Sequence, residues 1–495
     1  MYHKNQVLHK FPPIVKGLLE YADKNHYGWH IPGHHFGRSA WKPWHDLLGQ
    51  AIFDIDGAAE LPGLDNLYDP KGIILEAERA AAEYFNVDEV RFLVNGSTIG
   101  NLAVILGCCK EGDKVFVPRN CHQSVMQGLV LSGARPVYLP VHWDSGLGLV
   151  GALQTEDLEK ALSSESRGEG LVILLHPSWH GITGELQTQV ETAHGYGMKV
   201  LVDEAHGPHF RAGSQFPITG IKAGADYSVS SAHKTLGAFG QASWLHFRDS
   251  HDPSVEAIKE ALKLVETSSP SYILLASLDV ARYQLQVNHK GWRDAALMGE
   301  ELRTKINRIP GLWAPGKEFL EAKGVCGYDP TRLSVNVSGL GITGFEAKQW
   351  LFEKANTVLD VGDLQYLIYI LDPKVTEKEE REILRGLESL SAAYSNTMRL
   401  KKVDKDCDLG LEFPIPKQEM TPRQAFFSKR RRVPLDESVG KIAGEPITPY
   451  PPGIPLVCPG EIIGMEVIES LSAWQAAGGI WPGQEDNTIA VIDGK

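Results

Sequence analysis

The stretch KVLVDEAHGPHF, residues 199–210, decides how the chain folds and what chemistry it carries. Its apolar run ends in DEAH, the acidic box of a large helicase group. Asp203, His206 and His209 also have residue types that bind metals. A helicase motor, however, needs a GxxxxGK[ST] phosphate loop, and the sequence contains none. A glycine and a proline follow His206 and break any helix that would align the three side chains, so metal hydrolysis is disfavoured as well.

Composition narrows the classes of partner. The chain has 495 residues, of which 43% are hydrophobic, enough for a substantial core and two or three domains. Its net charge is −13, which does not favour a nucleic-acid partner. The only dense basic run is Lys429–Arg432. We interpret it as a solvated turn.

Cysteines and hydropathy indicate the compartment. None of the six cysteines forms a CxxC pair, so neither a zinc site nor a disulfide framework is predicted. The start of the chain has no apolar h-region, and no apolar stretch approaches the roughly 18 residues of a membrane span. We expect a soluble, cytoplasmic protein with no membrane partner.

The middle of the chain alternates between helical patterns and short β-rich runs, which predicts βαβ units and an α/β fold with a mainly parallel sheet. The seven runs cover residues 90–94, 114–118, 135–140, 171–176, 199–205, 226–231 and 242–247.

The chain is expected to divide into three parts. Residues 1–50, rich in His, Trp, Gly and Pro, form an N-terminal arm with one short helix. Residues 51–304 form the large, cofactor-binding domain, and residues 305–495 form a smaller α+β part. The proline-rich but apolar segment 448–461 is expected to be packed and not to be a linker.

Polar residues stand where these strands end, and ligands of open α/β sheets bind at that edge. Gly96, Ser97 and Thr98 follow the first run and open an apolar helix, so their amides and hydroxyls form a cradle suited to a phosphate. "GST" before a helix is also an ordinary cap, so this signal alone is weak. His122 follows the second run.

Lys234 follows another apolar run directly, with Ser231 and His233 beside it. Desolvation at such a position lowers the pKa of an amine and makes it nucleophilic. Pyridoxal 5′-phosphate needs a lysine for its aldehyde, a carboxylate for its pyridine nitrogen and an anion cradle for its phosphate. Asp203 supplies the carboxylate, and small Ala205 lets a flat ring approach. The combination favours this cofactor, although Asp203 could also be a buried cap and Lys234 a surface residue.

The motifs that carry these residues resemble one family. SSAHKTLGAFGQASWLHF, VDEAHGPHF, LVNGSTIGN, PRNCHQS, ETSSPSYILLASLD and PYPPGIPLVCPGE together resemble the Orn/Lys/Arg decarboxylases of the type I, aspartate-aminotransferase fold. The likeness runs from HIPGHHFG (30–37) to the last fifty residues. The short length resembles the bacterial branch that contains biosynthetic arginine decarboxylases.

The resemblance implies roles for the strand-end residues. Lys234 would be the Schiff-base lysine, Asp203 the partner of the pyridine nitrogen, and His122 the residue stacked on the ring. Further implied contacts to the cofactor are phosphate ligands Gly96, Ser97, Thr98, Ser231 and His233, and site-lining residues Ala205 and His206. Ser268, in TSSPSY, would reach the phosphate of a partner subunit. The resemblance thus implies a homodimer, or a larger homo-oligomer, with shared active sites.

The predicted reaction is decarboxylation of a basic amino acid, with L-arginine to agmatine first, in polyamine biosynthesis, then lysine and ornithine. A guanidinium or ammonium at the far end of the substrate needs a carboxylate. The candidates are Glu461, Asp54, Asp56 and Glu60. Lys234 or His206 would return the proton to the α-carbon. Where relatives often have PGHK, this chain has PGHH, so the role of that lysine is not assigned to His35.

Two alternatives stay open. Another type I reaction, such as transamination or side-chain lyase chemistry, would use the same cofactor residues. A regulatory protein that binds the cofactor without catalysis would also keep the fold. The presence of both Lys234 and Asp203 argues against the second alternative.

Overall fold

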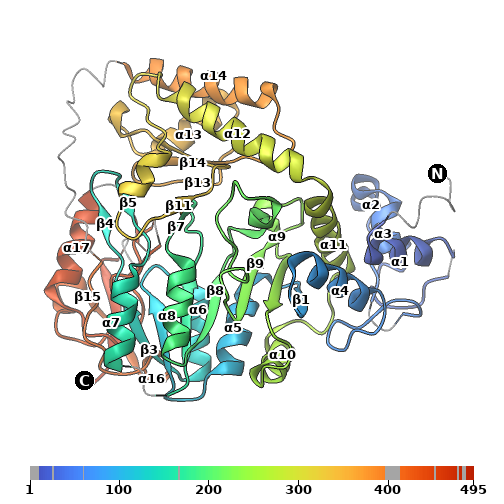
Figure 1. Ribbon diagram of the computed structural model, residues 1–495, viewed down its shortest axis with the longest axis horizontal. Helices are drawn as coiled ribbons and strands as arrows, with labels where there is room; N and C mark the ends of the chain where they lie inside the picture. Colours follow the sequence, from blue (N-terminus) through green and yellow to red (C-terminus); the bar gives the residue numbers. More distant parts are fainter. Residues whose placement is uncertain are drawn as a thin grey trace. The chain divides into compact units, whose positions relative to one another are not determined.

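The structure is a computed structural model in which the chain forms two compact units (Figure 1). It describes residues 11–24, 27–58, 61–165, 168–395, 413–450, 453–476, 479–481 and 486–494. The first unit comprises Met1–Cys108, Asp203–Ala212 and Thr219–His289, and the second comprises Cys109–Val202, Gly213–Ile218 and Lys290–Lys495. The domain boundaries expected from the sequence, at residues 50 and 304, stay predictions.

The seven predicted strands are all present in one sheet, in the order β1-β10-β9-β8-β6-β2-β3. They are β1 Glu89–Leu93, β2 Lys114–Pro118, β3 Arg135–Leu139, β6 Leu171–Leu175, β8 Lys199–Asp203, β9 Tyr227–Ser231 and β10 Ser243–Phe247. β2 is parallel to both β3 and β6, whereas β10 is antiparallel to both β1 and β9. β2, β6, β8, β9 and β10 are buried at nearly every position, as expected for strands of a sheet that is covered on both faces.

Helices of the first unit pack on β1 and its neighbours, except α10, which packs on α5. They are α4 Ile73–Phe85, α5 Gly96–Cys108, α10 Ser254–Val265 and α11 Tyr272–Val287. α4 turns Ile74, Ala77 and Ala81 into a buried cluster with Val90 and Phe92 of β1, as its helical periodicity predicts. α5 and α10 lie side by side (Figure 1).

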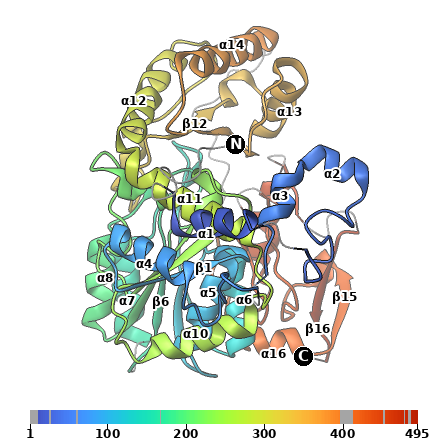
Figure 2. The same cartoon turned by 90° about the vertical axis from the view of Figure 1, so that its right-hand side faces the viewer.

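Within its described residues, the N-terminal segment contains three helices, α1 Pro13–Ala22, α2 Lys42–Leu48 and α3 Gln50–Ile55 (Figure 2). The expectation of one short helix is therefore wrong. α1 and α2 each have a proline in their first turn, where its missing N–H costs nothing. α2 and α3 have only 7 and 6 residues, too few for a hydrophobic period to be recognised.

The second unit adds α6 Gln123–Ser132, α7 Thr155–Glu165 and α8 Leu186–Gly195 beside its own strands. Further along the chain lie α12 His289–Ile306, α13 Gly344–Ala355 and α14 Glu377–Ala393, with the three-stranded sheet β12-β14-β13 (Figure 2). Those strands are β12 Arg332–Asn336, β13 Val361–Gly362 and β14 Tyr366–Ile370.

The last eighty residues form a packed α+β segment, as expected. α16 Pro422–Phe427, α17 Met465–Ala476 and the antiparallel strands β15 Arg430–Pro434 and β16 Thr488–Ile492 surround a core. Ile454, Leu456 and Val457 are buried in that core. The basic run at 429–432 is exposed, as predicted, but most of it is strand β15 and not a turn.

Short elements complete the described chain. They are β4 Trp143–Asp144, β5 Leu149–Val150, β7 Ile182–Thr183, β11 Gly327–Tyr328, the one-turn α9 Ala232–Thr235, and the 3-10 helices Pro208–Ala212, Lys317–Glu321, Ser338–Leu340 and Leu435–Glu437. Among the described residues, no helix combines the length and apolar character needed to cross a bilayer.

Candidate active site

Lys234 stands one turn beyond β9, on the short helix α9. β9 is buried at every position, and the chain leaves it through this single turn, so the lysine is held partly buried at the carboxyl end of the strand. Its Nζ lies 3.1 Å from Nε2 of His206. The two nitrogens share one hydrogen bond, which places a proton-exchanging imidazole beside the amine.

Asp203 is the last residue of β8, the strand that neighbours β9. It is 4% exposed. One carboxylate oxygen, Oδ2, accepts a hydrogen bond from Nδ2 of Asn101 at 2.9 Å, and Oδ1 accepts the Ala205 amide at 3.2 Å. These bonds hold the carboxylate in one orientation. Sequence reasoning missed Asn101, although an asparagine inside the apolar helix IGNLAVILG was a visible signal.

Three serine hydroxyls meet where α5 begins. Oγ of Ser97 lies 2.7 Å from Oγ of Ser231 and donates to Oγ of Ser243 at 3.2 Å. Gly96 precedes them with a φ of +81°, a conformation that favours glycine, and its amide donates to the Gln241 carbonyl. A helix N-terminus and hydroxyls are groups that can bind an anion, and the role of this cluster as the phosphate cradle stays a prediction. Ser243, the first residue of β10, was not predicted as a site residue.

Two further predicted phosphate ligands are Thr98, next to Ser97 in the sequence, and His233, next to Lys234. Thr98 is half-buried in the first turn of α5. His233 has its Nδ1 3.0 Å from the carbonyl oxygen of Ala242, so Nδ1 donates to that oxygen.

The residues present fit pyridoxal phosphate. Thr235, next to Lys234, is 8% exposed, and its Oγ1 has no hydrogen-bond partner among the described residues. A buried hydroxyl of this kind is satisfied when a polar ligand binds. The amine, the oriented carboxylate and the serine cluster supply the three groups that the cofactor needs.

Glu204, the second residue of DEAH, has different hydrogen-bond partners from Asp203. Its Oε2 accepts the Ser228 hydroxyl at 3.0 Å, and its Oε1 accepts the Gly220 amide at 3.1 Å. Burial raises the pKa of this carboxyl to about 8, while the two hydrogen bonds lower it. Glu204 therefore ties the loop near Gly220 to β9.

His122 lies in the second unit. It is the N-cap of α6, and its Nδ1 accepts the Ser124 amide at 3.2 Å and lies 2.8 Å from the Ser124 hydroxyl. Its role as the stacking residue stays a prediction.

The predicted substrate carboxylates differ in their surroundings. Asp56 Oδ2 lies 3.2 Å from Nε2 of His34, whose Nδ1 accepts the Gly37 amide. Asp54 accepts a hydrogen bond from Gln50. Glu60 lies outside the described residues.

Ser268, the predicted contact to a partner subunit, is exposed in the turn before α11.

Glu461 is fully buried, with both oxygens engaged. Nη1 and Nη2 of Arg119 donate to its Oε1 and Oε2 at 2.8 and 2.7 Å, and the Cys458 amide donates to Oε2. Arg119 also donates to the carbonyl oxygens of Pro455 and Leu456. This pair therefore joins the end of β2 to the C-terminal segment. The substrate role of Glu461 stays a prediction, and its contacts support a structural role. Arg119 was not singled out from the sequence.

Comparisons with known proteins agree with this geometry. Residues 12–374 match the Orn/Lys/Arg decarboxylase major domain, and residues 411–492 match the C-terminal domain of the same family. The chain is 35% identical over 482 residues to a protein of Bacillus anthracis named arginine decarboxylase, covering 97% of this chain and 96% of that one.

Solved structures show the fold. The lysine decarboxylase LdcF of Francisella novicida superposes with a TM-score of 0.84 at 19% identity, covering 98% of this chain and 81% of that one. A structure titled SPT with PLP internal aldimine superposes with a TM-score of 0.54 at 18% identity, over 78% of this chain and 84% of that one. The fold is that of type I pyridoxal-phosphate enzymes. The chain belongs to the Orn/Lys/Arg decarboxylase family and is a decarboxylase, that is, a carboxy-lyase.

Proposed function

We propose that this enzyme converts L-arginine to agmatine with pyridoxal phosphate attached to Lys234. The observation that carries the proposal is the pairing of Lys234 with His206 at one strand end and of Asp203 with Asn101 at the neighbouring one. When bound, the cofactor accepts the electrons left on the α-carbon as carbon dioxide departs.

Each residue then has a task defined by its contacts. Lys234 would supply the amine that holds the cofactor covalently. Asp203, held by Asn101, keeps a proton on the pyridine nitrogen. His206 holds or moves a proton at Nζ of Lys234, and either residue can return a proton to the α-carbon. Ser97, Ser231 and Ser243 hold the phosphate, with the amides of α5.

A carboxylate of the enzyme that pairs with the guanidinium of the substrate would determine which amino acid is bound. Asp56 is the leading candidate, because Nε2–H of His34 donates to one of its oxygens and fixes its direction. Its side chain is 30% exposed, so it keeps access to a ligand, in contrast to the buried Glu461. Arginine comes first because the Bacillus relative is named for it, with lysine second and ornithine third. Agmatine formation would place the enzyme in polyamine biosynthesis, and its cytoplasmic location stays a prediction.

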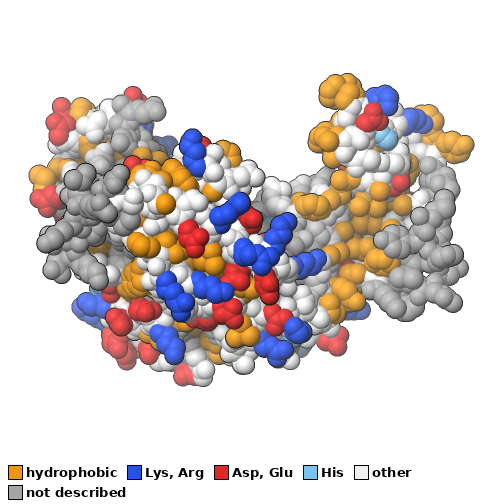
Figure 3. Space-filling model, turned by 90° about the horizontal axis from the view of Figure 1, so that it is seen from above, with side chains coloured by type: hydrophobic (Ala, Val, Ile, Leu, Met, Phe, Trp, Pro, Cys, Tyr) orange, Lys and Arg blue, Asp and Glu red, His pale blue; other side chains and the backbone are white. Residues whose placement is uncertain are grey.

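A homodimer with shared active sites accounts for two surface features. Ser268 is exposed, as a residue that reaches a partner subunit must be. Hydrophobic side chains gather over the N-terminal segment (Figure 3), including Tyr27, Trp29, Ile31 and Trp41, which are 75–90% exposed. Large exposed apolar patches of this kind mark interaction surfaces.

One product assay tests the proposal. The purified protein with pyridoxal phosphate is given arginine, lysine and ornithine separately, and carbon dioxide and amines are measured beside Lys234→Ala. Agmatine formed only by the intact enzyme is the expected result. Cadaverine or putrescine instead would reassign the substrate. A keto acid without carbon dioxide would indicate transamination, and bound cofactor without any product would indicate a regulatory protein.

A further inference from the structure

β1 is the edge strand of the seven-stranded sheet, with β10 as its one neighbour. Alternate amides of an edge strand point away from the sheet and need other acceptors. Here those amides belong to Phe92 and Val94. Oε1 of Glu78 accepts the first at 2.9 Å, and Oε1 of Glu266 accepts the second at 2.9 Å.

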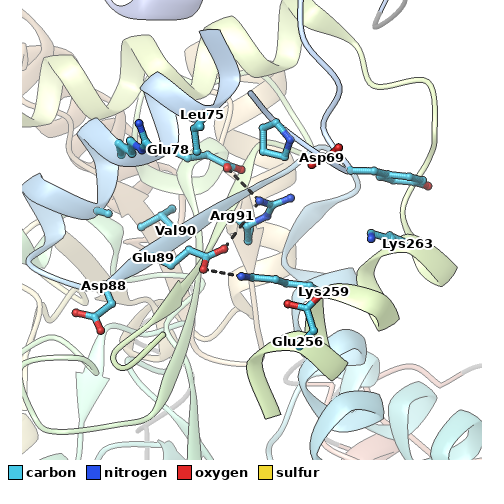
Figure 4. A pocket seen from close by; sticks show the side chains of 14 residues that line it. Asp69, Leu75, Glu78, Asp88, Glu89, Val90, Arg91, Glu256, Lys259 and Lys263 are labelled. Carbon is cyan, nitrogen blue, oxygen red and sulfur yellow. Dashed lines mark hydrogen bonds and ion pairs between the residues drawn. The ribbon is translucent and has the colours of Figure 1, made fainter. Parts of the chain in front are cut away.

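The two acceptors come from elements far apart in the sequence. Glu78 lies on α4, and Glu266 is the residue that ends α10. Both are buried, with 3% and 9% exposure. Arg91 donates to Glu78 and to the Leu67 carbonyl, and Glu89 pairs with Lys259 (Figure 4). These residues, other than Glu266 and Leu67, line a pocket of about 450 Å³.

Glu266 immediately precedes the exposed turn that carries Ser268. The turn is tied back to the end of β1 a second time, because Oδ1 of Asn95 accepts the Thr267 amide at 3.1 Å. The hydroxyl of Tyr68 donates to the Glu266 carbonyl at 2.6 Å. The residue that follows Asn95 is Gly96, where the phosphate cradle begins.

The far end of the same turn is also fixed. The hydroxyl of Tyr272, the first residue of α11, is bonded to the backbone of Asp65. The Asp65 carboxylate in turn accepts amides at the start of α4, including those of Gly72 and Ile74. Residues 267–269 are exposed between these two anchors. The turn is therefore held at both ends while its tip remains accessible.

We propose that Glu266 is a positioning residue that locks the Ser268 turn to the start of the subunit's own phosphate cradle. This inference rests on the proposed function, in which Ser268 contacts the cofactor phosphate of the partner subunit. Each subunit then contacts its own cofactor at Ser97 and its partner's cofactor at Ser268. The contacts of Glu266 and Asn95 connect these two positions. Loss of the brace loosens both cofactor sites.

The test compares Glu266→Ala, Asn95→Ala and Glu266→Gln in the full-length protein. The glutamine keeps an oxygen for the Val94 amide, so it should restore most of what alanine loses. Glu260→Ala is the matched control, since Glu260 is an exposed acid on the same helix, α10. Two properties are measured, namely the rate at which pyridoxal phosphate is released and hydrogen exchange of residues 94–98 and 266–272.

We expect Glu266→Ala to speed cofactor release about tenfold or more and to raise exchange in both segments, because the buried Val94 amide loses its acceptor. Glu266→Ala and Ser268→Ala should be partly non-additive on release, since the first acts in part through the second. Unchanged release, or strictly additive effects, would overturn the inference. Wild-type protein that retains cofactor but decarboxylates nothing would overturn the proposed function alone, because release and exchange do not depend on turnover.

Discussion

Nζ of Lys234 lies 3.1 Å from Nε2 of His206, so the imidazole of the DEAH stretch touches the amine that follows β9. This contact joins two segments 28 residues apart. The DEAH stretch therefore needs no nucleotide to explain it, because its histidine, His206, contacts Lys234 and its aspartate, Asp203, binds Asn101.

Lys234→Ala should abolish covalent attachment of pyridoxal phosphate and all amine production, because the amine that binds the aldehyde is gone. Borohydride reduction followed by peptide mass spectrometry measures the attachment. In the wild type the added mass should map to residue 234. Cofactor mass on another lysine of the wild-type protein would contradict the assignment.

Asp203→Asn should lower kcat by about 100-fold or more while the protein stays folded, because an amide cannot stabilise a protonated pyridine nitrogen as a carboxylate does. The isosteric amide can still accept from Ala205, which spares the fold. Steady-state kinetics and circular dichroism measure the two effects. A well-folded variant with near-normal kcat would refute the role of Asp203.

Glu461→Gln should destabilise the protein by about 3–5 kcal/mol, because it leaves the buried Arg119 guanidinium without its counter-charge. Urea unfolding gives the free energy. Glu419→Gln, in an exposed pair with Lys417, should change stability little. Wild-type stability with a raised KM for arginine would instead make Glu461 a substrate contact.

Asp56→Asn should raise KM for arginine about tenfold with less effect on kcat, since a charge-assisted hydrogen bond to the guanidinium becomes a neutral one. Initial rates over a range of arginine concentrations separate the two constants. Asp46→Asn, on the exposed surface with Lys42, is the control. If both variants give the wild-type KM, the guanidinium is bound by another group.

Glu204→Gln should change how stability depends on pH. Burial raises the pKa of Glu204 to about 8 from an ordinary 4.5. A raised pKa contributes stability that is complete below pH 4.5 and is lost as pH rises through about 8. Unfolding free energies from pH 5 to 9 should therefore show the wild type losing stability relative to the variant, levelling off above about pH 8. A constant difference would show that the carboxyl does not titrate in this range.

The strands and the candidate catalytic pair could be predicted from the sequence because each depends on local order. Strands appear as short apolar runs, and a ligand edge follows from where they end. Lys234 and Asp203 stand directly after such runs. By contrast, the short helices α2 and α3 escaped prediction, because 7 and 6 residues are too few to show a helical period.

Contacts between distant segments depended on the fold. Asn101, 102 residues before Asp203, and Arg119, 342 residues before Glu461, have no sequence signal that names their partners. The same is true of Glu266, which reaches Val94 across 172 residues.

The sequence by itself therefore determined the α/β class, the strand ends and the residue types that suit pyridoxal phosphate, because these follow from periodicity and from neighbours along the chain. Only the tertiary structure decided that Glu461 is buried against Arg119, that Lys234 meets His206, and that Glu266 caps the edge of β1. A buried carboxylate and an exposed one look alike in a sequence, and only packing decides which of them loses its water.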